Sequence, residues 1–306
     1  MTLAIERVRY GGWKNNVRLA NKEIELVVTE EVGPRIIRLG FAGTPNLFAE
    51  IGGQMGSVKE DEWLIRGGHR FWIAPEEKPK TYELDNDTVE IQRVAAGIRT
   101  IQAVGPLSGI QKTMEIKLAP NRNEATITHT LTNKGRKPVT VAPWALSAMA
   151  PNGMAIIPLP KRIPHTDRLT HNQEWSLWGY TALTDPRWTF GARYVFFRQD
   201  SKKGPNKLGM VHREGWVAYQ LDGFLFVKWF QRTEGAAYPD GGCNFETFSN
   251  EDFMEVETLG PLTLLVPGQS VGHVETWQLF RGVQAIKTEA DADRMVQRLI
   301  KKPTHA

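Results

Sequence analysis

The sequence predicts an all-β protein, a large sandwich of two sheets with one helix near the C-terminus. Three observations support this fold class. Segments rich in β-branched and aromatic residues alternate with Gly, Pro and Asn turns from residue 88 onward. Only one stretch has the spacing of an amphipathic helix. No internal repeat of fixed period is evident, which argues against a propeller, and the strands are too many for a small barrel. With 306 residues, the chain can bury a large core, and we expect one domain over residues 1–306.

The predicted elements follow from hydrophobic periodicity and turn residues. The helix, at 288–302, has Thr288 as its N-cap and acidic residues in its first turn, where they suit the helix dipole. Segments 50–87 and 158–190 lack a period, and long irregular segments are often functional. We expect strands at 17–20, 24–29, 33–39, 88–93, 99–104, 110–118, 124–133, 139–148, 194–199, 208–212, 216–221, 224–231, 253–259, 262–266 and 271–280.

Composition excludes several classes of function. The net charge is only +4 and no run of five basic residues occurs, so nucleic acid is not an expected partner. No stretch approaches 18 apolar residues, so we expect no membrane span. The N-terminus lacks the pattern of a signal peptide and Cys243 is the single cysteine, which together indicate a cytoplasmic protein without disulfides.

Two acidic residues on one predicted strand are the first candidates for chemistry. Glu255 and Glu257 are two positions apart in the strand 253–259, so their side chains share one face, roughly 6.5–7 Å apart at Cα. Paired carboxylates in a partly buried site repel each other, which can raise one pKa and leave one acid and one base. The alternative is a strand face in contact with water.

Basic residues supply the next candidates. His69 and Arg70 follow two glycines in the irregular segment 50–87, where the backbone can approach a ligand closely; the alternative for His69 is a structural role. Lys228 stands in an apolar strand, so we expect it to be paired or to lie at a cleft, with a carboxylate of the strand 253–259 as the obvious candidate partner. Its alternative is a lysine that protects a sheet edge.

The turn that begins at Tyr238 offers polar groups of another kind. Asp240 and Asn244 can present a carboxylate and an amide to a polyol, although the Pro-Asp-Gly-Gly sequence is first of all a turn. Motifs for a metal, a phosphate loop or a nucleophilic serine are absent from the sequence, so we expect no metal and no cofactor. The ten tryptophans favour a polar ligand with an aromatic-lined site, such as a sugar.

Several of these pieces resemble a known family. Val256-Glu257-Thr258, the turn Val266-Pro267-Gly268-Gln269 and the pair Thr276-Trp277 resemble the C-terminal signature of aldose 1-epimerases, the galactose mutarotases. The stretch GGHRFWIAPE is similar to the Gly-rich loop of glucose-6-phosphate epimerases in the same superfamily. The resemblance covers most of the chain. In overall pattern, the sequence is similar to bacterial mutarotase-like proteins. It implies a β-supersandwich of the galactose mutarotase type, with a sugar cleft on a concave sheet.

The resemblance also implies roles for residues. Glu257 stands where these epimerases have the general base that takes the proton of the C1 hydroxyl. Their middle-strand histidine, which protonates the ring oxygen, has no counterpart in 142–147, where Trp144 stands instead. Either His69 is the acid or ring opening is not catalysed. Glu255 would tune Glu257 or pair with a lysine. The expected substrate-binding residues are Arg35, Arg70 and Lys228 for hydroxyls or an anionic group, Trp144 and Tyr238 for stacking, and Asp240 and Asn244 for hydroxyls.

Four functional hypotheses follow. The first is a carbohydrate-binding, mutarotase-like protein that acts as an aldose or sugar-phosphate epimerase. The second is a non-catalytic sugar-binding or sensor domain. The third is a polysaccharide lyase or hydrolase, which needs an extended groove and suitably spaced carboxylates. The fourth is a structural protein whose acidic strand faces water.

Overall fold

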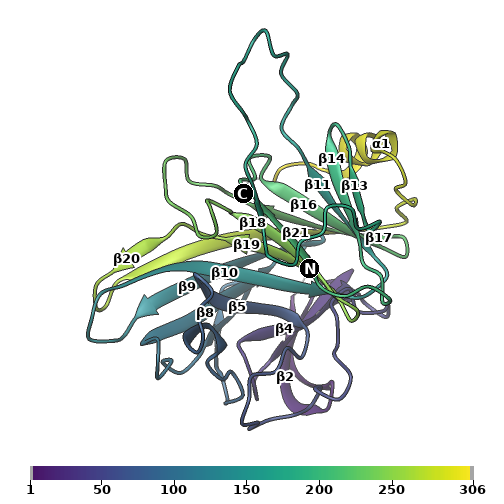
Figure 1. The fold of residues 1–306 in the computed structure, drawn as a ribbon. Helices are drawn as coiled ribbons and strands as arrows, with labels where there is room; N and C mark the ends of the chain where they lie inside the picture. Colours follow the sequence, from purple (N-terminus) through teal and green to yellow (C-terminus); the bar gives the residue numbers. More distant parts are fainter. Residues whose placement is uncertain (1–2, 304–306) are drawn as a thin grey trace.

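The computed structural model describes residues 3–303 and consists of two large antiparallel sheets packed face to face (Figure 1). A single helix, α1 (Glu289–Leu299), follows the last strand. The predicted all-β sandwich with one C-terminal helix is therefore confirmed.

The first sheet has eleven strands and carries the residues of greatest interest. Its central strands, β5, β10, β19, β18 and β15, come from distant parts of the chain. The order of the sheet is β1 (Ala4–Tyr10), β2 (Trp13–Ala20), β3 (Ile24–Thr29), β4 (Arg35–Phe41), β5 (Gly68–Ala74), β10 (Val139–Met149), β19 (Met254–Leu259), β18 (Phe245–Ser249), β15 (Asn206–Met210) and β12 (Trp175–Leu177), with β20 (Thr263–Leu265) paired to β10.

The second sheet has ten strands and covers the inner face of the first. Its order is β13 (Trp188–Phe190), β14 (Tyr194–Arg198), β11 (Met154–Pro158), β16 (Trp216–Leu221), β17 (Phe224–Phe230), β21 (Ser270–Arg281), β9 (Glu124–Asn133), β8 (Ile110–Leu118), β7 (Gly97–Ile101) and β6 (Glu90–Val94). A short 3-10 helix, Lys80–Tyr82, lies between β5 and β6.

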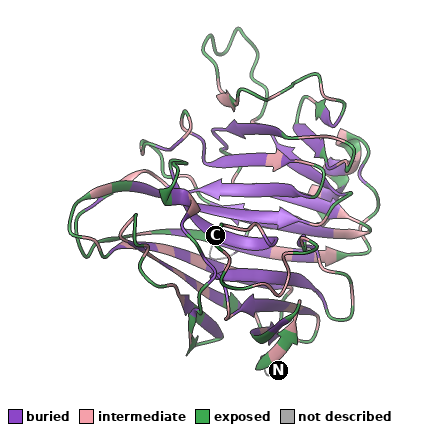
Figure 2. Ribbon diagram, turned by 60° about the horizontal axis from the view of Figure 1, so that its bottom comes forward, coloured by how far each residue is buried: buried purple, intermediate pink, exposed green. Residues whose placement is uncertain are grey.

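The two sheets differ in how many of their faces are covered. In β8, buried side chains alternate with more exposed ones, as expected for a strand with one face in water. In β5, β10 and β19 almost every side chain is buried, on both faces (Figure 2). The outward cover over β5 includes Trp63 and Tyr82, whose rings pack on Trp72. The centre of the first sheet therefore has a second buried region on its outward side.

The helix α1 closes the outward face of the second sheet. Thr288 is its N-cap and forms a capping box with Asp291, as the sequence predicts. Ala292 and Met295 are buried against a cluster that includes Ile156 and Trp229. No helix within residues 3–303 is long and apolar enough to cross a membrane.

Some elements differ from the prediction. The segment 50–87 contains the central strand β5, and 158–190 contains the short strands β12 and β13. The strands β1, β11 and β18 were also not predicted. β5 and β11 are buried at every position, so they lack the alternation by which a half-buried strand is recognised.

Candidate functional site

Strand register brings two glutamates side by side on the outward face of the first sheet. Glu257 of β19 lies directly opposite Glu246 of β18, and on its other side opposite Leu146 of β10. Arg70 of β5 continues the same row. Because directly opposed residues of antiparallel strands point to the same face, these side chains share one surface.

Glu257 is fully buried and is bound by two donors. Trp144 Nε1 donates to Glu257 Oε2 over 2.9 Å, and Lys207 Nζ lies 3.2 Å from the same oxygen. Burial raises the pKa of Glu257, while the charge of Lys207 opposes that rise. The expected contact of Trp144 with the site is therefore an edge contact, through its N–H.

Glu246 is the second carboxylate and shares the same lysine. Its Oε2 lies 2.6 Å from Lys207 Nζ, and the residue is fully buried. Burial raises the pKa of Glu246 to about 8, with the neighbouring charge of Glu257 acting in the same direction. Burial alone would lower the pKa of Lys207, but the charges of Glu257 and Glu246 raise it well above its usual value.

This carboxylate pair, Glu246 and Glu257 around Lys207, is best described with one proton. Two ionised carboxylates beside one ammonium leave a net negative charge in a buried region, which is costly. A proton on Glu246 neutralises the group at pH values below about 8. Glu257 is the better choice for the ionised member, because the Trp144 N–H stabilises a charged acceptor. The pair thus has an acid and a base at neutral pH.

Glu255 has a different partner. It lies two residues before Glu257 on the same face, as predicted, and its Oε1 is 2.5 Å from Arg70 Nη1. The guanidinium of Arg70 lies over the ring of Trp72, 4.3 Å from its centroid. Arg70 therefore forms an ion pair with Glu255, and its guanidinium also stacks on the Trp72 ring.

Aromatic rings cover the carboxylate pair. Lys207 Nζ lies 4.6 Å from the Trp178 ring centroid and 4.9 Å from that of Trp144. A Cβ at Gly209 would come within 3.0 Å of the Trp178 ring and 2.8 Å of Cys243 Sγ, so the glycine leaves room for that ring. Thr181 Oγ1 donates to the Lys207 carbonyl and fixes this turn on β15.

His69 lies on the opposite face of the sheet. It is paired in register with Ser147, and Ser147 with Val256, so it points between the two sheets, away from Glu257. Its Nδ1 is 2.8 Å from Ser147 Oγ and its Nε2 is 2.8 Å from His129 Nε2. The expectation that His69 and Glu257 face one ligand is therefore wrong.

Lys228 is also between the sheets. As expected for a buried lysine it is paired, but with Glu275 of β21 at 2.9 Å and not with the carboxylates of β19. Its Nζ also donates to the Val256 carbonyl over 2.9 Å. Glu275 in turn accepts from Thr258 Oγ1 and from Trp277 Nε1. This network contacts both neighbours of Glu257 from behind.

The same buried network contains groups of the type that bind metals. Ligand atoms of His69, His129 and Glu275 lie within 4.8 Å of one another. Burial lowers the pKa of both histidines, that of His129 to about 4, so they are neutral as ligands must be. Each ligand atom is already hydrogen-bonded, however, and the Lys228 ammonium lies 2.9 Å from Glu275. We therefore assign this cluster a structural role.

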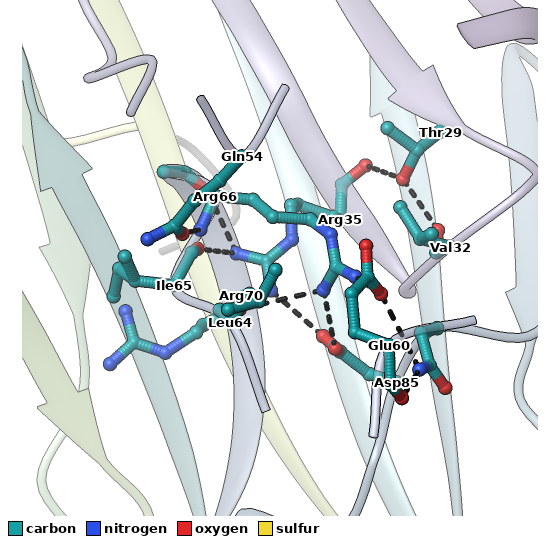
Figure 3. Close-up of polar contacts among 12 residues, drawn as sticks. Thr29, Val32, Arg35, Gln54, Glu60, Leu64, Ile65, Arg66, Arg70 and Asp85 are labelled. Atoms are coloured by element: carbon teal, nitrogen blue, oxygen red, sulfur yellow. Dashed lines mark hydrogen bonds and ion pairs between the residues drawn. The ribbon is translucent and has the colours of Figure 1, made fainter. Parts of the chain in front are cut away.

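Arg35 shares the outward face with Arg70 but serves a separate cluster (Figure 3). Its Nη2 lies 2.8 Å from Asp85 Oδ2, and its Nη1 donates to the carbonyls of Ile65 and Gly67. Figure 3 shows the Arg70 guanidinium pointing away from Asp85. The Arg35 Nε is buried and has no hydrogen-bond partner, whereas Nη1 and Nη2 already donate to protein groups. These contacts do not support the expected sugar-binding role of Arg35.

The three residues predicted near the turn at 238 have separate positions. Tyr238 lines a surface pocket of 230 Å³ that also includes His273 and Thr276, and Glu257 is not part of it. The side-chain amide of Asn244 accepts from the His212 N–H through Oδ1 over 2.7 Å and donates to the His212 carbonyl through Nδ2 over 2.9 Å. Asp240 is close enough to Glu246 for its charge to help raise that residue's pKa, after the larger effects of burial and Glu257.

Three residues of the site, Glu246, Lys207 and Trp178, are not among those that the sequence predicts there. Glu246 stands between Phe245 and Phe248 in the stretch CNFETF, and a single acid between aromatic residues of a strand is expected to be paired when it is buried. Lys207 is the last residue of a polar stretch, KKGPNK, and nothing in the neighbouring sequence distinguishes it from an exposed lysine. Its role depends on strand pairing between β15 and β18, which is set by tertiary structure.

Known structures share this fold across most of the chain, although no protein-family profile and no curated protein sequence matches it. A galactose mutarotase-like protein from Lactobacillus casei is 10% identical with a TM-score of 0.58, over 87% of this chain and 100% of that one. A provisionally assigned aldose 1-epimerase from Escherichia coli K12 is 12% identical with a TM-score of 0.54, over 92% and 100%. A galactose mutarotase related enzyme from Lactobacillus acidophilus is 10% identical with a TM-score of 0.58, over 89% and 100%. The fold is therefore of the galactose mutarotase type.

We predict that Lys228→Met destabilises the protein by about 3–5 kcal/mol, because it leaves the Glu275 carboxylate buried without its cation. The double variant Lys228→Met/Glu275→Gln should recover part of this loss. Urea unfolding measures both. Lys80→Met, which breaks an exposed pair with Glu77, is the control and should have a much smaller effect. Unchanged stability of Lys228→Met would contradict the assigned role of the ion pair.

We also predict that the free energy of unfolding falls as pH rises from about 5 to about 8. The pKa of Glu246 is raised to about 8 in the folded state from an unfolded value of 4.5, so its contribution is complete below about pH 4.5 and is lost as pH rises through about 8. The slope is on the order of 1 kcal/mol per pH unit while Glu246 is protonated only in the folded state. Glu246→Gln has no proton to lose and should flatten this decline in urea midpoints. Parallel pH profiles for the two proteins would show that Glu246 is ionised throughout.

Proposed function

We propose that the protein binds an aldose on the outward face of the first sheet and interconverts its anomers by general acid–base catalysis. The observation that most supports this proposal is the carboxylate pair, in which Lys207 contacts both the proposed base, Glu257, and the proposed acid, Glu246. We infer that the ligand is a sugar by analogy, because the fold is like that of mutarotase-like structures.

In this mechanism Glu257 and Glu246 act on two oxygens of the sugar. Glu257 takes the proton from the C1 hydroxyl as that oxygen becomes a carbonyl. The bond between C1 and the ring oxygen breaks, its electron pair stays on the ring oxygen, and Glu246 donates its proton there. Rotation about the adjacent bond and the reverse steps close the ring on the other face. Protons and charges balance, and no cofactor is needed.

The mechanism replaces His69 with Glu246 as the acid. A pKa of about 8 means that Glu246 holds a proton at neutral pH, while it can still release it. Lys207 stabilises whichever carboxylate is ionised as the proton moves, because it contacts both. The group therefore returns to the same net charge after each turnover.

Sugar binding needs movement of the aromatic cover. Glu257 and Glu246 are fully buried, whereas Tyr180 is exposed and Trp178 is partly buried. We expect the turn with these two rings to swing away, so that an aldose takes the place of the Trp178 ring above Lys207. Trp72 and Arg70 would then contact the far side of the sugar.

We predict that Glu257→Gln lowers kcat for anomer exchange by about 10²–10⁴-fold, because it removes the base. Glu246→Gln should lower kcat similarly and abolish a loss of wild-type activity above about pH 8. Saturation-transfer NMR or polarimetry over a panel of aldoses measures the rates. Glu251→Gln, an exposed residue before β19, is the control.

Two other outcomes would redirect the assignment. Wild-type rates no higher than those of Glu257→Gln on every aldose would refute the epimerase proposal. Calorimetric binding without turnover would then favour a sugar-binding or sensor protein. Cleavage of an oligosaccharide by wild type, lost in Glu257→Gln, would favour the hydrolase or lyase hypothesis instead.

A further inference from the structure

The charges around the carboxylate pair restrict the kind of sugar that fits. We propose that the site prefers an aldose with an amino group over one with a phosphate or a carboxylate. This inference rests on the proposed function, since it needs a sugar at Glu246 and Glu257. It differs from the expectation from sequence that Arg35, Arg70 and Lys228 hold hydroxyls or an anionic group of the sugar.

The first argument is the number of charges on the face. Glu246 and Glu257 both contact Lys207, so two acids share one cation. Arg70 lies on the same face, but its charge is balanced by Glu255 at 2.5 Å. A phosphate placed here would meet more carboxylates than cations, and like charges in a desolvated site repel strongly.

The neighbouring arginines offer no unbalanced positive charge either. Arg35 and Arg66 both contact the Asp85 carboxylate, at 2.8 and 3.2 Å, and Arg66 also pairs with Glu60. Figure 3 shows these groups gathered into one closed cluster. The remaining basic residue of the sequence hypothesis, Lys228, is on the other face of the sheet with Glu275. None of the cations first expected at the sugar is therefore free for an anion.

The second argument is the set of unused hydrogen-bonding atoms. Among the residues from 3 to 303, no donor reaches Glu246 Oε1 or Glu257 Oε1, although both atoms are buried. An unpaired buried acceptor is costly, so a ligand that brings donors gains most. A hydroxyl brings one donor, whereas an ammonium brings three and a positive charge. The ionised second carboxylate would then have its own cation.

The third argument is that the site already stabilises an ammonium group. Lys207 Nζ lies over two indole rings, Trp144 and Trp178, while it contacts the two carboxylates. A sugar ammonium that enters as the Trp178 ring leaves would find carboxylate oxygens beneath it and the Trp144 ring beside it. The chemistry of this buried group therefore suits a second ammonium better than an anion.

Binding of such a sugar must also release a proton. Glu246 is protonated below about pH 8, and an ammonium beside it favours the ionised form. We expect up to one proton released per amino sugar bound at neutral pH, but none for a neutral sugar. Calorimetry in two buffers of different ionisation enthalpy measures this number directly.

The test compares the affinities of four probes of one configuration: glucosamine, glucose, glucose 6-phosphate and glucuronic acid, with the galacto series in parallel. We expect glucosamine to bind at least about tenfold more tightly than the phosphate or the uronic acid. In Glu246→Gln this preference and the proton release should disappear, while binding of glucose remains. Glu251→Gln is the matched control and should keep the wild-type order.

Each outcome has a distinct meaning. If no probe binds and no aldose is turned over, the proposed function fails. If neutral sugars bind but glucosamine gains nothing over the anionic probes, the inference about charge fails alone. If Glu246→Gln does not fold, proton release from the wild type still decides: its absence with bound glucosamine overturns the inference.

Discussion

An ion pair between the two sheets holds the candidate site from behind. Lys228 of the second sheet pairs with Glu275 and donates to the Val256 carbonyl of the first sheet, while Glu275 accepts from Thr258. These contacts fall on the two residues that flank Glu257. In a strand, neighbouring side chains point to opposite faces, so the inward network and the outward carboxylate are parts of one arrangement. The backbone of β19 is thus anchored on its inward face.

The fold was largely predictable from the sequence, and the site only in part. Where one face of a strand is more exposed, as in β8 and β9, alternation locates the strand and its bounds. The strand β5 is buried throughout, so its pattern resembles an irregular apolar segment. Glu257 was found through the residues around it. Its partners Glu246 and Lys207 come from strands about 10 and 50 residues away in sequence, and only strand pairing shows that they meet.

The misassigned histidine has the same cause. His69 and Arg70 are adjacent in sequence, and both types of side chain are common at catalytic sites. One residue of difference places Arg70 on the outward face and His69 in the core, where burial keeps it neutral. Sequence shows that a polar residue stands in an apolar stretch, but the face follows from a register that tertiary packing decides. The acid that we propose is Glu246, a carboxyl whose pKa is raised by burial, so the proposed role comes from its surroundings and not from its residue type.

The alternation along β19 has a consequence for how this protein can change over evolutionary time. Exchange of a side chain on the outward face leaves the anchoring contacts of Val256 and Thr258 in place, so the chemistry of that face can change without rebuilding the core. Insertion or deletion of one residue is different, because it would turn Glu257 toward the core and one of its two neighbours outward. Relatives that diverge in specificity are thus expected to differ by substitution here, and to keep the length of this strand constant.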